Sequence, residues 1–287
     1  MSDFYAETRA IVESKANTLS KYTYDTYLSH LRKLQMYRPT AECRDITEAF
    51  VYGYIDFMHA RKNSAGCIYR SLSILRMFIR ELLRRRKMRR DPMRDFPLKK
   101  VRNRREFLEI DELEKLYSGF RERSEQLNFS EREALRAFLF SCFTGLRFSD
   151  LRALSPHDIH NGKIRIFTQK TGAQVYIPIP AQALALLEGT GETALHVVDN
   201  STFNKNLRAA AKKLDFHSHL HAHIARHTFA TSCVSFGVPI EVISKVLGHA
   251  NIQTTLIYAN YSNKVIDREM EKFKINVPAG RFPGIRS

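Results

Sequence analysis

KIRIFTQKTGAQVYIPIP, residues 163–180, departs from the helical pattern of the sequence around it. Apolar and polar residues alternate on both sides of the central QKTGA, which is the two-residue period of a β-strand. The stretch therefore predicts a β-hairpin with Lys170 at or beside its tip, and it makes the fold class mainly α with a small β-sheet. The alternating apolar positions are Ile164, Ile166, Val175, Ile177 and Ile179.

Helical periodicity returns on both sides of this hairpin. On the N-terminal side an apolar helical stripe begins near Glu106, so we expect a domain to start there. On the C-terminal side Gly237 and Gly248 are placed to end helices, and Pro239 to begin one. The predicted C-terminal helices cover residues 203–214, 226–236, 239–247 and 264–273.

The first hundred residues are typical of a helical bundle. Ser64 is placed to cap a helix, and the apolar residues after it recur at steps of three and four. The first clear stripe follows residue 17. The stripe after Ser64 consists of Ile68, Leu72, Leu75, Ile79 and Leu82.

Two prolines, Pro92 and Pro97, then interrupt the helical pattern, because proline disfavours a helical residue before it. We therefore expect a helical domain over residues 1–90, an extended basic linker over 91–106 and a second domain over 107–287.

The charge of the chain indicates a polyanionic partner. Its 46 basic and 30 acidic residues give a net charge of +16. Residues 84–105 hold twelve Lys and Arg against Asp91 and Asp95. Charges this dense repel each other unless a partner neutralises them, and nucleic acid is the favoured partner over an acidic membrane surface. The residues expected to contact DNA are Arg84, Arg85, Arg86, Lys99, Lys100, Arg102, Arg104 and Arg105.

The sequence also points to a cytoplasmic protein associated with the nucleoid. It has no stretch close to the roughly 20 apolar residues of a membrane span. The N-terminal MSDFYAETRAIVESK carries charges where a signal peptide needs an apolar run. Four cysteines are scattered without a disulfide or CxxC pattern, which fits a reducing compartment.

Three further segments, together with the hairpin, bring chemically capable residues into the second domain. FTGLRFSDLRAL (143–154) places Arg147 after a glycine turn and Asp150 three residues later. HAHIARHTFAT (221–231) puts His223 and Arg226 one helical turn apart. LGHANIQTTLIYANY (247–261) contributes His249 and Tyr258. The set has no carboxylate pair for a metal, no phosphate-binding glycine loop and no serine–histidine motif.

Such a set is suited to phosphodiester chemistry. Two guanidinium groups can hold the non-bridging oxygens of one phosphodiester. A lysine can protonate the departing alkoxide. A tyrosine, whose pKa is ordinarily about 10, becomes a competent nucleophile in a positive field. The resulting phosphotyrosine ester conserves the energy of the broken bond, so the reaction needs neither ATP nor a metal, and we expect no cofactor.

Six residues of these segments, in their order along the chain, resemble the active-site set of the tyrosine recombinases, the phage integrase family. The sequence around them is closest to that of bacterial, Xer-like members. TGLRFSDL, HIARHTFAT, LGH and TTLIYAN look like that family's motif boxes. The resemblance covers about residues 107–275 and implies an α+β catalytic domain, preceded by a helical core-binding domain that clamps DNA. The six are Arg147, Lys170, His223, Arg226, His249 and Tyr258.

The resemblance also implies roles for the two arginines and the tyrosine. Arg147 and Arg226 would grip the scissile phosphate, and Tyr258, on a short helix after His249, would attack it. The activity implied is site-specific recombination through a 3′-phosphotyrosyl intermediate, with integration, excision, inversion or resolution as its outcome.

The remaining residues would assist. Lys170 would be the general acid, His223 an acid/base and phosphate ligand, and His249 a hydrogen-bond donor to the phosphate. Asp150 would support the arginines, although many members have glutamate at that position.

The partners implied are double-stranded DNA with inverted-repeat sites and further copies of the chain. An amphipathic stripe near the C-terminus, Ile266, Met270 and Phe273, would link a free monomer into a homo-tetramer on DNA. The short segment before the first stripe leaves no room for a separate arm-binding domain.

Three other readings remain open. The histidine-rich HSHLHAHIARH (217–227) is of a kind that can bind zinc, although its spacing suits four-coordinate ligation poorly. VSFGVPIEVISKVLGH is compatible with a helix-turn-helix in a non-catalytic, sequence-specific DNA-binding protein. A topoisomerase of the related tyrosine class would use the same nucleophile. A covalent protein–DNA adduct would exclude the second reading.

Overall fold

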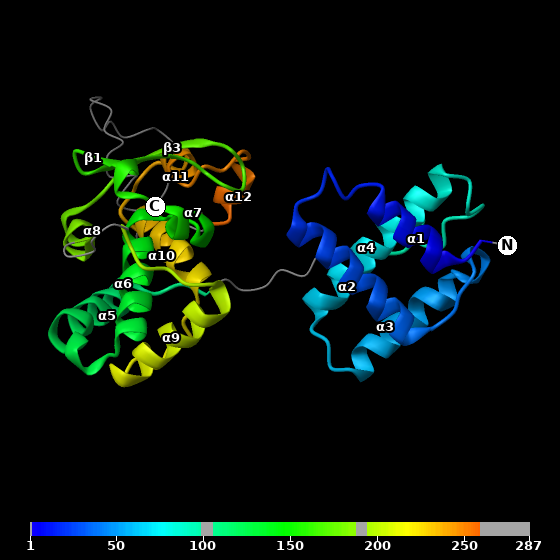
Figure 1. Cartoon of the computed structure of the whole chain (residues 1–287), viewed down its shortest axis with the longest axis horizontal. Helices are drawn as coiled ribbons and strands as arrows, with labels where there is room; N and C mark the ends of the chain where they lie inside the picture. The colour runs from blue at the N-terminus through cyan, green and yellow to red at the C-terminus, as the bar shows by residue number, and fades with distance from the viewer. Residues whose placement is uncertain (1, 99–105, 188–193, 259–287) are drawn as a thin grey trace, which may run out of the picture. The chain divides into compact units, whose positions relative to one another are not determined.

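The computed structural model describes residues 2–98, 106–187 and 194–258 (Figure 1). The chain divides into two compact units, Met1–Arg104 and Arg105–Ser287. The described part is mainly helical with a three-stranded sheet, which confirms the predicted fold class. None of the described helices is long and apolar enough to cross a membrane.

Four helices build the first unit: α1 (Phe4–Glu13), α2 (Lys21–Tyr37), α3 (Glu48–Ala60) and α4 (Ala65–Arg84). A side chain caps the N-terminus of each by accepting backbone N–H groups that would otherwise lack partners. The caps are Asp3, Ser20, Thr47 and Ser64.

The apolar faces of these helices form a main core and a smaller cluster of Val12, Ile74 and Phe78. The predicted stripe on α4 is buried, from Ile68 to Leu82. Helix α1 was missed because the sequence analysis placed the first clear stripe after residue 17. The side chains of Phe4 and Ile11 are nevertheless 0% and 1% exposed, so α1 belongs to the core.

The segment after α4 folds back onto the first unit. Met88 and Met93 are buried in its core, at 8% and 1% exposure. The guanidinium of Arg76 donates through Nη2 to the carbonyls of Met93 and Phe96, at 3.2 and 2.7 Å. Residues 91–98 therefore pack on this unit, whereas the sequence predicted an extended linker from residue 91. Helix α4 ends at Arg84, before either proline, with Arg86 in the left-handed conformation, and the methionines between the arginines anchor the chain.

The second unit is organised around α6 (Phe129–Thr144), most of whose residues are buried. Helices α5 (Ile110–Arg123), α9 (Asn200–Lys213) and α10 (Ala222–Ser235) pack against α6. Figure 1 shows the sheet at one end of this unit, with α11 (Ile240–Val246) and α12 (Gln253–Leu256) beside it. The shorter elements are α7 (Phe148–Ala153), α8 (Ala181–Leu184) and the 3₁₀ turns η1 (Cys43–Asp45), η2 (Ser124–Gln126), η3 (Pro156–Asp158) and η4 (Ala185–Leu187).

The predicted hairpin is present as β2 (Lys163–Phe167) and β3 (Gln174–Pro178), paired antiparallel with Ile164 opposite Ile177. A further short strand, β1 (Ile159–His160), pairs with β2. The turn between β1 and β2 is Asn161-Gly162, with both residues at positive φ, a sequence that favours tight hairpin turns. At two residues, β1 is too short to show an alternating pattern.

Three predicted helices of the second unit are present with shifted ends. Helix α9 begins at Asn200, and α10 begins at Ala222. Tyr258 lies two residues beyond the end of α12, in a turn, where the sequence had placed it on the helix. The predicted helix 264–273 lies outside the described residues.

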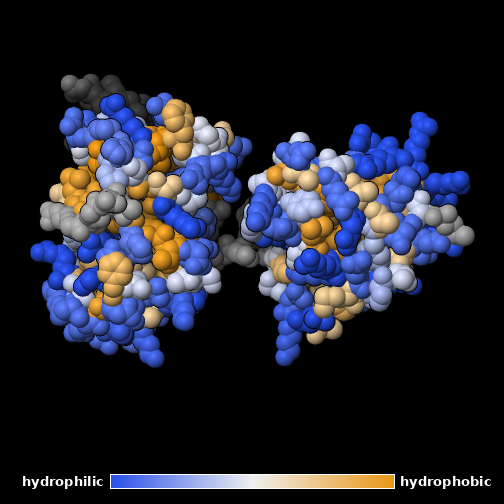
Figure 2. Space-filling view, in the orientation of Figure 1, coloured by the Kyte–Doolittle hydropathy of each residue, from blue (hydrophilic) through white to orange (hydrophobic). Residues whose placement is uncertain are grey.

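Hydrophilic side chains cover most of the surface seen in Figure 2. Hydrophobic side chains emerge between them, and on the second unit the most exposed large ones include Phe167 and Phe236, at 71% and 68%.

Candidate active site

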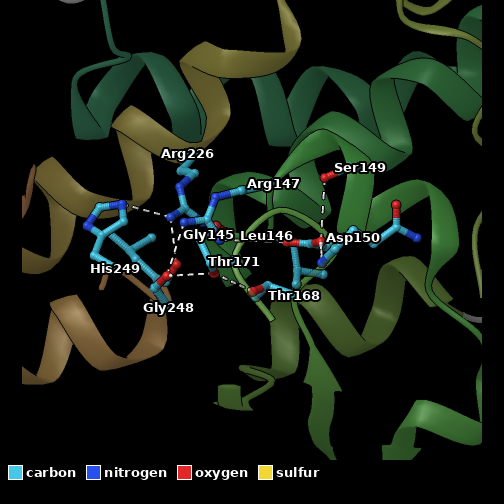
Figure 3. A network of polar contacts seen from close by, with 12 residues as sticks. Gly145, Leu146, Arg147, Ser149, Asp150, Thr168, Thr171, Arg226, Gly248 and His249 are labelled. Atoms are coloured by element: carbon cyan, nitrogen blue, oxygen red, sulfur yellow. Dashed lines mark hydrogen bonds and ion pairs between the residues drawn. The ribbon is translucent and has the colours of Figure 1, made fainter. Parts of the chain in front are cut away.

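Arg226 lies at the centre of a polar network in the second unit (Figure 3). Its side chain is buried on α10, and Nη1 donates to the carbonyl of Gly145 at 2.8 Å. Nη2 donates to the carbonyl of Leu247 at 2.6 Å and lies 2.9 Å from Nε2 of His249. Gly145 and Leu247 are the C-caps of α6 and α11, so the cation sits where two helices present carbonyls with no partner inside the helix.

Two glycines make this arrangement possible. Gly145 has φ +69°, and a Cβ there would come within 2.5 Å of the Phe229 ring. Gly248 has φ +58°, and a Cβ there would lie 2.7 Å from Cγ1 of Val175. At both positions the left-handed backbone and the close neighbour together require glycine.

Arg147 lies beside Arg226. It precedes α7 as its N-cap, and its Nη2 donates to the carbonyl of Gly248 at 3.1 Å. Its Nη1 is 3.9 Å from Oδ2 of Asp150 and is buried without a hydrogen-bond partner among the described residues. A buried guanidinium N–H in this state is suited to an anionic ligand.

The two arginines leave a net positive field. Burial, and to a smaller extent repulsion from Arg147, lower the pKa of Arg226 to about 9. Burial also lowers the pKa of Arg147, while Asp150 opposes that shift. Because a pKa of about 9 lies above neutrality, Arg226 stays charged there. One carboxylate then faces two cations, and a bound phosphodiester would supply the missing negative charge.

Asp150 connects the arginines to the hairpin. Its side chain is 3% exposed, and Oδ1 accepts the backbone N–H of Gln169 at 2.9 Å. On the other side of the turn, the hydroxyl of Thr171 donates to the carbonyl of Gly248 at 3.4 Å and lies 2.7 Å from that of Thr168. The backbone on both sides of Lys170 is therefore fixed by the contacts of Gln169 and Thr171. The side chain of Lys170 itself is exposed. Figure 3 shows Asp150 on the side of Arg147 away from His249, and Gly248 close to His249.

His249 is fixed from both ring nitrogens. Nε2 contacts Arg226, and Nδ1 lies 2.7 Å from the hydroxyl of Thr255, which is fully buried. The ring is thereby kept beside the guanidinium pair.

Tyr258 reaches the same helix α10 by a different contact. Its ring packs against a small apolar cluster that includes Val234 and Ile243. Its hydroxyl lies 2.6 Å from Nδ1 of His227, which is 8% exposed. The ring of His223 packs edge-on against that of His227, with 4.6 Å between centroids.

All six predicted residues thus lie on connected parts of one unit. Arg147, Arg226 and His249 share the network directly, Lys170 is attached by its turn, and Tyr258 and His223 meet at His227. His227 was not among the residues predicted from the sequence, although it directly follows Arg226 and lies one helical turn after His223. The structural partners Gly145, Gly248, Thr168, Thr171 and Thr255 were not predicted to be part of the site either.

The histidine-rich tract divides between two places. His219 and His221 face each other, and Nε2 of His221 is 3.9 Å from a carboxylate oxygen of Glu106. The ring of His223 packs against that of His227 instead, and His227 contacts Tyr258. In the described part of the chain, no three His, Cys, Asp or Glu side chains are grouped to hold a metal ion.

Three of the eight residues predicted to contact DNA lie within the described part of the chain. Arg84 and Arg85 both contact Glu81, at 2.6 and 2.9 Å, and these two hydrogen bonds lower the pKa of Glu81 to about 2. Arg86 is exposed, with φ +58°. The other predicted residues, Lys99, Lys100, Arg102, Arg104 and Arg105, lie outside the described residues.

Comparison with known proteins agrees with this geometry. The model of the phage integrase family matches residues 106–264, and that of the phage integrase SAM-like domain matches residues 3–101. Tyrosine recombinase XerC of Pelobacter propionicus is 29% identical over 300 residues, covering 96% of this chain and 95% of that protein. Tyrosine recombinase XerD of Listeria monocytogenes is 27% identical, covering 85% and 88%.

Two solved structures share the fold. The Tn1549 transposon integrase in complex with a circular intermediate DNA superposes with a TM-score of 0.77 at 16% identity, covering 96% of this chain and 100% of that one. A lambda integrase (75–356) dimer bound to a COC′ core site gives 0.74 at 20% identity, covering 90% and 94%.

The chain belongs to the phage integrase family. It is a tyrosine recombinase of the Xer-like, bacterial kind, an enzyme of site-specific DNA recombination.

Proposed function

We propose that Tyr258 attacks one DNA phosphodiester while Arg147 and Arg226 hold its non-bridging oxygens. The observation that carries this assignment is the pair of guanidinium groups facing a single carboxylate, with Nη1 of Arg147 buried and lacking a hydrogen-bond partner among the described residues. The proposal accounts for that N–H, because a phosphate oxygen would accept from it.

The charge that develops at phosphorus is stabilised by groups that are already in place. Arg226 is fixed by two main-chain carbonyls, so it has little reorganisation to undergo when the phosphate binds. In this structure Nε2 of His249 accepts from Nη2 of Arg226, because a guanidinium has no acceptor. We propose that a bound phosphate replaces this contact and that Nε2, once it carries the ring proton, donates to the phosphate. Asp150 contacts both Arg147 and the backbone of the hairpin turn, and it thereby fixes their positions relative to each other.

Lys170 supplies the proton for the leaving oxygen. The backbone on either side of it is held to Asp150 and Gly248, while the side chain extends into solvent. This placement fixes the start of a flexible side chain close to the arginines and leaves its ammonium free to reach the DNA. Attack by Tyr258 and protonation by Lys170 give a 3′-phosphotyrosyl ester and a free 5′-hydroxyl. Attack by a second 5′-hydroxyl then reverses these steps and joins new strands.

The recombination site is double-stranded DNA that contains inverted repeats, and each repeat binds one copy of the chain. The solved relatives include a lambda integrase dimer bound to a core site and a lambda integrase tetramer bound to a Holliday junction. We infer that this chain, a monomer when free, likewise assembles into a tetramer on DNA. The C-terminal stripe at Ile266, Met270 and Phe273 is the segment proposed to link the copies. A DNA substrate supports a cytoplasmic, nucleoid-associated location.

Trapping the covalent intermediate tests the assignment. The binding site is first selected from a random pool of duplexes, and a nick is then placed so that a short cleaved strand diffuses away. Wild-type protein should accumulate as a protein–DNA adduct that survives denaturing electrophoresis. Tyr258→Phe should bind the same duplex with unchanged affinity and form no adduct, because only the hydroxyl is lost. An adduct with Tyr258→Phe would assign the nucleophile to another residue.

The non-catalytic alternative rested on the segment in which α10, the turn at Gly237 and α11 follow one another as in a helix-turn-helix. In this fold, however, the C-terminal carbonyl of α11 holds Arg226. The segment therefore serves the phosphate site, and an adduct in the experiment above would exclude this candidate.

A further inference from the structure

The contact between His227 and Tyr258 suggests a role that none of the six predicted residues performs. Nδ1 of His227 lies 2.6 Å from the hydroxyl of Tyr258, within the range of a short hydrogen bond. The two residues are 31 positions apart, so the fold creates this contact. The contact involves the phenol oxygen of Tyr258, which is the atom that forms the new bond to phosphorus.

We propose that His227 is a catalytic residue that accepts the proton of Tyr258 as the tyrosine attacks, and returns it when the strands are rejoined. This proposal rests on the proposed function, in which Tyr258 is the nucleophile. It assigns the base of the reaction to a side chain separate from His223.

The location of His227 on α10 supports this assignment. His227 directly follows Arg226, so one helix carries both the proton acceptor and the phosphate ligand. The relative positions of Tyr258 and the phosphate are then tied to a single rigid element. A displacement of about 1 Å in such a geometry costs roughly 10²-fold in rate, which makes a shared helix an effective way to keep the alignment.

The ring of His227 is buried against its neighbours. The side chain is 8% exposed, Arg226 directly precedes it in the chain, and Tyr258 and His223 pack against its ring. When Nε2 carries the ring proton, the lone pair of Nδ1 accepts the phenol O–H.

The proton and electron balance of the step is complete. The oxygen of Tyr258 bonds to phosphorus as the bond from phosphorus to the 5′-oxygen breaks. The phenol proton passes to Nδ1 of His227, and the departing oxygen takes a proton from Lys170. In the joining step a 5′-hydroxyl attacks, its proton goes to Lys170, and His227 returns its proton to the phenol oxygen.

Two substitutions separate proton acceptance from simple positioning. His227→Phe keeps the size of the ring without its nitrogens. His227→Asn keeps a polar group close to the position of Nδ1, but that group does not accept a proton in this pH range. His219→Gln is the matched control, because His219 is an exposed histidine of the same tract and lies outside the network.

Single-turnover adduct formation on the nicked duplex is measured for all four proteins across the neutral pH range. Both His227 variants should be slowed by about 10²–10⁴-fold at neutral pH, the usual contribution of a general base. Their rates should rise more steeply with pH than the wild-type rate, because hydroxide then has to remove the phenol proton. DNA affinity and thermal stability, measured alongside, identify any variant that fails to fold.

A more acidic nucleophile provides the second test. Replacing Tyr258 by a fluorinated tyrosine lowers the pKa of the phenol, so less help from a base is needed. The defect of His227→Phe or His227→Asn should shrink by about tenfold or more on this background. Lys170→Ala should show no such rescue, because its role lies with the leaving oxygen.

Wild-type rates in folded His227 variants would overturn the proposal, as would full activity of His227→Asn, which would leave His227 only a positioning role. If wild type and His219→Gln form the adduct and these results are found, the inference fails while the proposed function stands. If no adduct at Tyr258 forms in any of the proteins, the proposed function itself fails.

Discussion

Nη2 of Arg147 donates a hydrogen bond to the carbonyl oxygen of Gly248 at 3.1 Å, across 101 positions of sequence. The same carbonyl accepts the hydroxyl of Thr171, from the turn that carries Lys170. A single peptide group therefore connects a phosphate-binding arginine to the proposed general acid. The orientation of that peptide group depends on the left-handed backbone of Gly248.

Gly248→Ala should consequently weaken both stability and cleavage. The left-handed backbone alone costs an alanine about 1 kcal/mol or more, and the clash with Val175 adds to this cost. Gly162→Ala is the control, because Gly162 has a similar φ of +69° but its Cβ would meet only Leu184, at 3.9 Å. We expect the melting temperature to fall further for Gly248→Ala and its adduct formation to drop sharply. Equal shifts in the two variants would contradict the importance of the crowding.

Lys170→Ala should be rescued by a better leaving group. A departing alkoxide needs a proton, and general acid catalysis is typically worth about 10²–10⁴-fold. A thiolate needs no such help, so DNA with a bridging 5′-sulfur at the cleaved phosphate should restore most of the cleavage rate. Arg226→Ala provides the comparison, since its charge acts on the non-bridging oxygens and sulfur should not restore it. A Lys170→Ala defect of full size on the sulfur substrate would move the general-acid role to another residue.

The salt dependence of DNA binding should distinguish two groups of arginines. Each phosphate neutralised contributes about −0.9 to the slope of log affinity against log salt. Replacing Arg102, Arg104 and Arg105 with alanine should therefore flatten the slope by up to about three. Replacing Arg84 and Arg85 should have a smaller effect, because Glu81 already compensates their charge. Filter binding or fluorescence anisotropy at several salt concentrations measures both slopes, and an unchanged slope in the triple variant would exclude residues 102–105 from the DNA interface.

His30 should make the stability of the first unit sensitive to acid. Burial lowers its pKa from 6.5 to about 4, with smaller contributions from Lys33 and Arg70, and its Nδ1 lies 3.0 Å from the hydroxyl of Ser71. The folded pKa is below the unfolded one, so the unfolded chain binds more protons between these values. The contribution of His30 to the free energy of unfolding is complete above about pH 6.5. It decreases as the pH falls toward 4, by on the order of 2–3 kcal/mol.

Urea unfolding followed by circular dichroism between these pH values measures this effect. His30→Gln should flatten the pH dependence, whatever its effect on absolute stability. His59→Gln, at an exposed position of α3, should leave the dependence as it is in the wild type. Parallel curves for His30→Gln and the wild type would show that another group is responsible.

The fold class could be predicted from the sequence because the two periodicities are strong where they occur. Residues 163–180 alternate, α4 repeats at steps of three and four, and both patterns follow from burying one face. Helix α1 was missed because its ten residues follow the chain start, and its helix signal depends on Asp3, a cap that satisfies two backbone N–H groups. Residues 91–98 were misjudged because the basic composition hid Met93, which is buried in the core of the first unit.

The sequence could predict the residues of the candidate site whose side chains carry the chemistry. It could not predict the residues that contribute through their backbone. Arg147, Arg226 and Tyr258 could be singled out because they carry groups that phosphate chemistry uses and stand in segments that resemble the motif boxes of the tyrosine recombinases. Gly145 and Gly248 contribute through their carbonyls, which every residue has, so only the three-dimensional arrangement reveals them. The pairing of Glu81 with Arg84 and Arg85 was overlooked for another reason. Glu81 lies just outside the basic block in sequence, but one helical turn brings it into contact.

The carbonyls that hold Arg226 also set how the site responds to its environment. A carboxylate partner would gain a proton in acid and release the arginine, and an asparagine could deamidate with age. Main-chain carbonyls do neither, and substitution of the Leu247 side chain leaves its carbonyl in place. The hold on Arg226 should therefore persist under any condition in which α6, α10 and α11 stay folded, and its loss should report their unfolding.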